Sequence, residues 1–285
     1  MAVSIAQGFG FEKEWLEDAL YNIEDKPGVF LNSNNDEAQS IFGIGKNKVE
    51  ALYTWLKAMD FVEDFEEGHR LTSLGCLVKQ YDQYFKREGT WWVIHILLSR
   101  SKANVDLWYY FSNFWHSEKV FDRKTLFDFF KQKCTLASER SIKNGMNAVL
   151  TSIIDTPLTT LGVLSKIGKD ELIRKVPDIR ALHPSIVAFA IIKWAKDYNV
   201  DTIALQDLSD AIDSVGRVLF LNQYNIMIYL ERIADMYDRK VLSFNKAAGY
   251  NIVEVKIKEP NKILEAYYLE VVNKIKPYEA IKSLL

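Results

Sequence analysis

The chain has 285 residues, of which 48% are hydrophobic and 26% are charged. These values lie near the average of globular proteins, so they exclude a mainly disordered or low-complexity chain. The formal net charge of −2 excludes a protein that is basic throughout, although residues 1–40 are acidic and residues 239–285 are basic. No run of ~18 apolar residues and no basic leader followed by an apolar stretch is present. We therefore expect no signal peptide, no membrane span and a cytoplasmic location.

Cysteine and histidine spacing gives no metal motif. Cys76 and Cys134 lie far apart and outside any CxxC pattern, which predicts free thiols in a reducing compartment. The four histidines show neither HxxxH nor HExxH spacing, so a dedicated zinc site is not expected.

The first 88 residues predict a winged helix-turn-helix. Apolar spacing predicts a helix over residues 12–23, and a polar cap at residues 32–36 starts a second helix that runs through Ile41. Glycines at 43 and 45 make a turn before an amphipathic helix over residues 46–58. Residues 61–72 then read as a hairpin around a turn that contains glycine.

In a winged helix, the start of the second helix of the turn carries the groove-facing residues. Here those residues are Gly45, Lys46, Asn47 and Lys48, which we predict to contact DNA. Winged helices also bind proteins, and acidic residues at the hairpin tip oppose a phosphate backbone. A structural or protein-binding role therefore stays open. The Gly-Lys pair is no nucleotide-binding loop, because Ser40 and Asn47 stand where that motif needs Gly and Ser or Thr.

Residues 89–200 predict an aromatic-rich helical domain. The aromatic residues between 90 and 154 could stack nucleic-acid bases, but at this density on helices they are better explained as core. The helix start at residues 138–144 carries Arg140 and Lys143, which we predict as a second basic ridge for DNA. Strands at residues 162–166 and 172–176 predict a further hairpin.

Residues 201–285 predict a smaller, winged-helix-like unit. A helix from residue 205, a turn at 214–220, a helix over 223–236 and two strands at 241–244 and 251–257 follow the same order as the first domain. The fold class expected is thus mainly α with short β-hairpins: a winged helix, a helical middle and a winged-helix-like end.

Several segments in this order resemble a bacterial family of formerly unknown function associated with DNA phosphorothioation, the family of the SspB-type DNA nickases. The segments are Trp15-Leu16 after a Phe-rich start, residues 43–49 with Trp55-Leu56, residues 71–75 and residues 214–220. Two positions depart from the family pattern. The Phe-rich start lacks a histidine, and Val215 stands where a proline precedes the glycine of the later turn.

Nicking chemistry usually requires carboxylates that hold divalent ions. The nearest local pattern is Glu254-Val255-Lys256 on an expected strand, with Asp238 upstream. Asp238, Glu254 and Lys256 are therefore the candidate catalytic residues, although an exposed strand of alternating charges gives the same string. No metal ligands are assigned.

Three functions stay in competition. The resemblance implies a DNA-binding component of a phosphorothioate DNA-modification and phage-defence system that nicks one strand before sulfur insertion, with Mg or Mn as cofactor. Its partners would be double-stranded DNA and the sulfur-transfer enzymes. The alternatives are a non-catalytic adaptor for the sulfur-transfer enzyme and a winged-helix transcriptional regulator. A regulator is expected to be a symmetric dimer, and a homodimer is left open.

Overall fold

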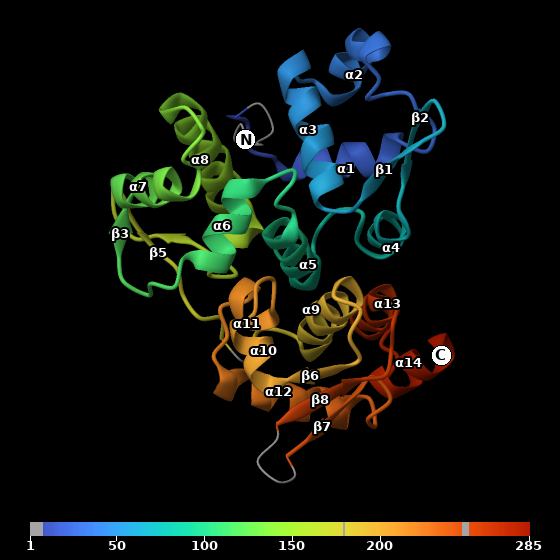
Figure 1. Cartoon of the computed structure of the whole chain (residues 1–285). Helices are drawn as coiled ribbons and strands as arrows, with labels where there is room; N and C mark the ends of the chain where they lie inside the picture. Colours follow the sequence, from blue (N-terminus) through green and yellow to red (C-terminus); the bar gives the residue numbers. More distant parts are fainter. Residues whose placement is uncertain (1–7, 179, 247–250) are drawn as a thin grey trace. The chain divides into compact units, whose positions relative to one another are not determined.

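The computed structural model describes residues 8–178, 180–246 and 251–285. The chain forms two compact units, Met1–Lys175 and Val176–Leu285, and each is described by itself (Figure 1). Both units are mainly helical with small antiparallel sheets, as the sequence predicted. The further division of the first unit near residue 88 stays a prediction.

The first unit contains eight α-helices among its described residues: α1 Lys13–Asn22, α2 Asn35–Phe42, α3 Lys46–Ala58, α4 Ser73–Asp82, α5 Glu88–Arg100, α6 Asp106–Phe114, α7 Arg123–Lys133 and α8 Glu139–Ile154. Its short elements are η2 Asn32–Asn34, η3 Pro157–Thr159, β1 Val62–Phe65, β2 Gly68–Leu71, β3 Phe121–Asp122, β4 Ser165–Lys166 and β5 Glu171–Ile173.

Helices α1 to α3 precede an antiparallel hairpin of β1 and β2, in the order that the sequence predicted. Helix α2 ends at Gly43, whose φ of 63° lies in the left-handed region that glycine adopts without a steric penalty. Helix α3 is tied to the hairpin by Asp64, which accepts hydrogen bonds from the Tyr53 hydroxyl and, at 2.6 Å, from Lys57 Nζ. These donors, with Lys57 the stronger, lower the pKa of Asp64.

The middle of the first unit is an aromatic core around α5, which is buried from Gly89 to Ser99. Trp108 of α6 donates a hydrogen bond from Nε1 to His95 Nδ1 at 3.2 Å. Eight of the aromatic side chains between 90 and 154 are buried: Trp91, Trp92, Trp108, Tyr109, Phe111, Trp115, Phe121 and Phe130. The interpretation of these aromatics as core is confirmed for them.

Helices α7 and α8 lie beside a three-stranded sheet of order β3-β5-β4. The middle of this unit, which the sequence predicted as helical, also contains strand β3, because Phe121 and Asp122 pair with β5. The predicted hairpin at 162–176 is present as the shorter strands β4 and β5.

A buried arginine joins this sheet to α6. Arg174, 2% exposed, donates from Nη1 to the carbonyls of Phe111, Ser112 and Trp115 at the end of α6. Burial lowers the pKa of Arg174 to about 9. A cation at the carbonyl end of a helix is favoured by the helix dipole, so Arg174 fixes α6 onto the sheet.

Residues 8–11 run between α3 and α8. Trp55 Nε1 of α3 donates to the Phe9 carbonyl at 2.9 Å, and the Phe11 amide donates to Ser152 Oγ of α8 at 3.0 Å. A Cβ at Gly10 would lie 2.9 Å from Ser152 Oγ, so this close approach requires glycine. The segment packs α8 against the rest of the unit.

The second unit is built around the buried helix α9, which packs against α12 and α13. Its elements are α9 Pro184–Asp197, β6 Thr202–Ala204, α10 Leu205–Asp210, α11 Val215–Val218, α12 Gln223–Met236, β7 Leu242–Asn245, β8 Ile252–Val255, α13 Pro260–Val271 and α14 Pro277–Leu284. The predicted helix at 223–236 and the two following strands are confirmed. Strand β6, which the sequence did not predict, completes a sheet of order β6-β8-β7.

Candidate functional site: a basic groove on α7 and α8

The start of α3 presents two polar side chains to solvent. Gly45 is the N-cap residue, and Lys46 and Asn47 in the first turn are exposed. Lys48 is half-buried, and its ammonium lies 4.9 Å from the centre of the Trp15 ring, in a cation–π arrangement. The four residues predicted to contact DNA thus lie together, but Lys48 already has an aromatic partner.

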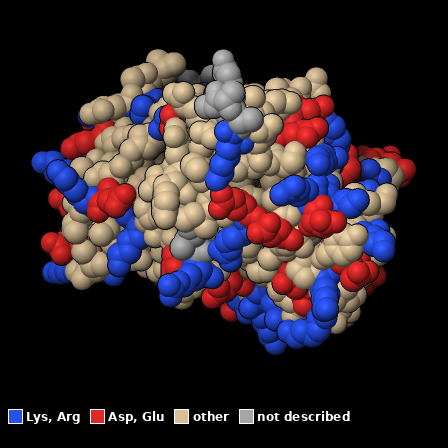
Figure 2. All heavy atoms as spheres, turned by 90° about the horizontal axis from the view of Figure 1, so that it is seen from below, with Lys and Arg blue, Asp and Glu red and all other residues tan. Residues whose placement is uncertain are grey.

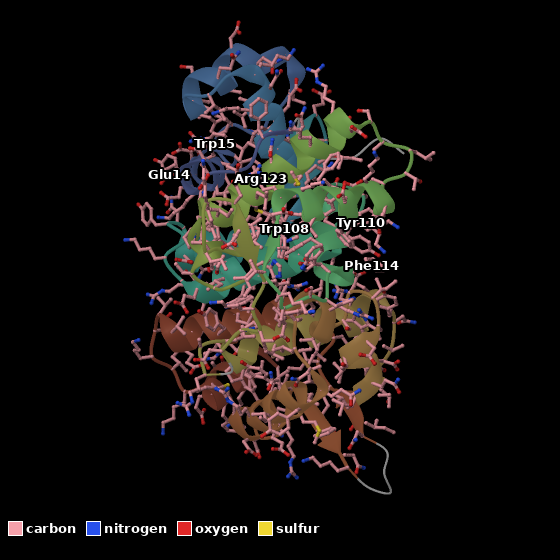
Figure 3. The ribbon with its side chains drawn as sticks, turned by 90° about the vertical axis from the view of Figure 1, so that its left-hand side faces the viewer. Glu14, Trp15, Trp108, Tyr110, Phe114 and Arg123 are labelled. Atoms are coloured by element: carbon pink, nitrogen blue, oxygen red, sulfur yellow. The ribbon has the colours of Figure 1, made fainter. Side chains whose placement is uncertain are left out.

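The other predicted basic ridge borders a cavity of about 690 Å³ between α7 and α8, here called the basic groove. Its lining residues are Arg123, Lys124, Phe127, Glu139, Arg140, Lys143, Met146 and Asn147. Arg123, Lys124 and Phe127 share one face of α7, because residues three and four apart in a helix are neighbours. Arg140, Lys143 and Asn147 share a face of α8 for the same reason. Figure 3 labels Arg123 at this site.

Local contacts fix the two helices that border the basic groove. Asp122 caps α7 by accepting hydrogen bonds from the Thr125 hydroxyl and the Thr125 amide, each at 2.7 Å, and these bonds lower the pKa of Asp122. Ser138 caps α8 by accepting from the Ser141 amide at 3.1 Å. Arg123 Nη2 donates to Asn147 Oδ1 and so joins α7 to α8. These contacts hold in place the two helices that border the groove.

The cations of the basic groove are not neutralised by carboxylates. In the described parts of the chain, Arg123, Lys124, Arg140 and Lys143 form no ion pair within 4.0 Å, although Lys124 lies near enough to Asp122 to help lower its pKa. Glu139, the one acidic residue of the lining, is bound by Lys131 at 2.5 Å. The groove is thus strongly positive.

A second hollow, of about 220 Å³, continues from Arg123 along the end of α8 to the β4–β5 turn. Lys166 and Lys169 add two exposed cations there, and Asp155 and Asp170 add two exposed carboxylates. Because Arg123 lines both hollows, the positive surface extends from α8 to the small sheet.

Asp238, Glu254 and Lys256 lie in the second unit. Glu254 is on the exposed face of the central strand β8, where its Oε2 accepts from Ser243 Oγ at 2.9 Å. Asp238 is exposed in the turn after α12, and Lys256 follows β8 with an exposed side chain. A catalytic role for the three residues stays a prediction.

Magnesium or manganese would need several oxygen ligands. Within residues 8–178, 180–246 and 251–285, no three His, Cys, Asp or Glu side chains are grouped so that they could hold a metal ion. Glu254 is engaged with Ser243 on a strand face, and the carboxylates of the second hollow lie among three cations. The described residues around Asp238 and Glu254 therefore form no metal centre of three protein ligands. The described helices also include none that is both long and apolar enough to cross a bilayer.

The basic C-terminal end differs from the basic groove in its ion pairs. Lys246 pairs with Glu231, and Lys258 pairs with Asp201. On the face drawn in Figure 2, Lys and Arg side chains lie among Asp and Glu side chains. Part of the charge of residues 239–285 is therefore neutralised within the protein.

The sequence predicts Arg140 and Lys143 but not the residues that face them. The sequence predicted no binding role for Arg123, Lys124 or Phe127. The one local signal was the basic pair directly after the cap residue Asp122. Their approach to α8 depends on tertiary structure, so no sequence spacing could reveal it.

The fold first defines a class: mainly helical proteins with small antiparallel sheets. A family model described as "Protein of unknown function (DUF4007)" matches residues 6–268, and the chain belongs to this family. Comparison with curated proteins gives no match.

Two solved structures are similar to the chain. A magnesium ion-bound SspB crystal structure has a TM-score of 0.77 and 18% identity over 99% of this chain and 96% of that one. A second SspB crystal structure has a TM-score of 0.79 and 18% identity over 99% and 93%. The resemblance expected from the sequence is thereby confirmed, and at this identity the likeness establishes the fold.

Proposed function

We propose that the protein is a DNA-binding component of a bacterial phosphorothioate DNA-modification and phage-defence system. The observation that carries the proposal is the basic groove, where Lys124, Arg140 and Lys143 form no ion pair with the described residues. Cations that can replace the counterions of DNA supply most of the affinity for a phosphate backbone. The SspB-like fold supports this proposal. We propose sulfur-transfer enzymes as partners and the cytoplasm as location.

The winged-helix interpretation of residues 1–88 adds a second DNA contact to this proposal. The helix start at Gly45, Lys46 and Asn47 would meet a phosphate through backbone amides and one lysine. Gly45 has no atom within 4 Å of its missing Cβ, so a backbone could approach it closely. The acidic hairpin tip would point away from the phosphates.

The activity proposed is cleavage of one DNA strand, which would expose the backbone for sulfur insertion. Its support is the fold likeness to a protein described as magnesium ion-bound, so magnesium is the first cation to test. The residues Asp238, Glu254 and Lys256 stay candidates for the chemistry. The adaptor function, which binds DNA without cutting it, is the alternative.

The test is conversion of supercoiled plasmid to open circle by the purified protein with Mg²⁺, Mn²⁺ or EDTA. The proposal predicts open circle with a divalent cation and none in EDTA. Plasmid binding without nicking under either cation would replace the nickase with the adaptor. An Asp238→Ala and Glu254→Ala double variant that nicks as well as wild type would leave the activity standing and remove these two residues from it.

A further inference from the structure

The basic groove is lined by an aromatic ring as well as by cations. Phe127 lies on the same face of α7 as Arg123 and Lys124, and Met146 of α8 lines the groove beside it. The Phe127 side chain is half-buried, unlike the fully buried aromatic core of α5 and α6. Within the described chain its ring is stacked on no other aromatic ring and lies under no cation.

The neighbouring aromatic rings of α6 and α7 already contact other rings or a cation. Phe129, two residues along α7, contacts Trp115 and Phe130, and the ammonium of Lys133 lies 5.8 Å from its ring centre. Tyr110 and Phe114 of α6 contact each other with ring centres 6.1 Å apart, and Figure 3 shows them on that helix. Phe127 is thus the half-exposed ring of α7 that remains available to a ligand inside the groove.

The size of the groove also decides between ligands. A volume of about 690 Å³ lies within the range of about 300–1,000 Å³ that small-molecule sites occupy, so it has room for a nucleotide. A duplex keeps its bases stacked inside, so it could offer the groove only phosphates. An unpaired nucleotide offers both a phosphate for the cations and a base for the ring.

We infer that the basic groove binds single-stranded DNA, with one base stacked on Phe127 and the adjoining phosphates on Lys124, Arg140 and Lys143. This inference rests on the proposed DNA-binding function and goes beyond its duplex partner. The bound strand is an unpaired segment, such as the end or gap that strand opening leaves. The groove then distinguishes single strands from duplexes by stacking, because charge alone attracts both.

The experiment measures fluorescence anisotropy at ~0.1 M salt with three labelled probes of about 12 nucleotides, a length within known single-strand site sizes. They are oligothymidylate, a duplex of mixed sequence, and an oligonucleotide with abasic sugars that keeps the phosphates. The variants are Phe127→Ala, Phe127→Leu, which keeps the apolar bulk without an aromatic face, and Phe127→Trp. Arg140→Ala with Lys143→Ala removes charge.

Loss of one stacked base weakens binding by roughly tenfold. We expect Phe127→Ala and Phe127→Leu to weaken oligothymidylate binding by about that factor, and to leave duplex and abasic binding within about twofold. Phe127→Trp should retain wild-type affinity, which also shows that the site is folded. The charge variant should weaken all three probes.

Two failures are distinguishable. If the charge variant weakens every probe but Phe127→Leu binds oligothymidylate like wild type, base stacking in the groove is overturned and the DNA-binding function stands. If the wild-type protein binds none of the probes, the proposed function fails together with the inference.

Discussion

The start of α3 and the basic groove are two positive surfaces of one unit, and they are built in different ways. At α3, Gly45, Lys46 and Asn47 are consecutive and lie on a protruding helix end. In the groove, cations from α7 and α8 line one hollow together with the Phe127 ring. Near α3 the sequence also places acidic residues at the hairpin tip, whereas the one acid of the groove is held by Lys131.

The difference teaches that charge alone does not identify a binding surface. Lys48 and Lys57 belong to the α3 region but already contact Trp15 and Asp64. Arg140 and Lys143 have no such partner among the described residues. A concave site also lets several cations act on adjoining phosphates at once, so we expect the groove to contribute more affinity than α3.

The largest expected effect is on stability and concerns Arg174, which joins α6 to the small sheet beside α7 and α8. Arg174→Met removes the donor that binds three carbonyls at the end of α6. A hydrogen bond from a charged donor contributes about 1.5–3 kcal/mol to stability, and the three contributions are not additive. Relief of the buried charge offsets part of this. We expect the free energy of unfolding to fall by about 3 kcal/mol, measured by urea denaturation. Exposed Arg180→Met is the control, and equal stability of the two variants would show that Arg174 does not hold α6 in place.

Next in size is the loss of two phosphate contacts. Each contact on duplex DNA contributes about 0.9 to the slope of log affinity against log salt, so Arg140→Ala with Lys143→Ala should lower affinity about 60-fold at ~0.1 M salt. Duplex binding across a salt series measures both values. Lys193→Ala with Lys196→Ala has the same spacing and charge change, but both lysines are in ion pairs. If this control loses as much affinity, the groove has no special role.

A smaller effect is expected at α3. Lys46→Ala removes one exposed cation, so affinity should fall about eightfold at ~0.1 M salt. The same salt series measures it. A greater loss of affinity than in the Arg140 and Lys143 variant would show that α3 contributes more to DNA binding than the groove does. No loss of affinity would assign the α3 surface to a protein partner.

Variants of the two glycines in the turn before α3 should affect stability and DNA binding separately. Gly43→Ala forces a side chain into the left-handed region and should cost about 1 kcal/mol of unfolding free energy. Gly45 has φ −71° and open space around its missing Cβ, so Gly45→Ala should be neutral for folding and weaken only DNA binding. Thermal denaturation together with anisotropy checks this pair. Unfolding of the Gly45 variant would show that the fold, not a ligand, requires that glycine.

The last prediction concerns a difference in thiol reactivity between Cys76 on α4 and Cys134 at the end of α7. Burial, together with Asp106, raises the pKa of Cys134 at the end of α7 to about 11. Thiolate forms as pH rises toward this value, so alkylation of Cys134 should be slow at pH ~8 and accelerate about tenfold per pH unit. Exposed Cys76 of α4 should react first. Mass spectrometry after iodoacetamide treatment follows both thiols, and faster labelling of Cys134 would contradict the packing of α7.

Local patterns predicted much of the fold. The glycine turn, the apolar spacing of α3 and the turn at Gly68 predicted α3 and its hairpin, because each depends on residues close in sequence. Strand β6 was not predicted, because three residues pair only once β8 lies beside them. The sequence predicted only the α8 side of the basic groove. Arg140 and Lys143 share a helix face, whereas Arg123, Lys124 and Phe127 join them only through helix packing.

The most direct test of the central claim locates DNA on the protein. Oligothymidylate and duplex DNA carrying a photoreactive group on the phosphate backbone would be crosslinked to the protein, and the modified residues identified by mass spectrometry. The account predicts crosslinks concentrated in residues 123–147, with a weaker set at residues 45–48. Crosslinks confined to the second unit, or to residues 45–48 alone, would contradict it.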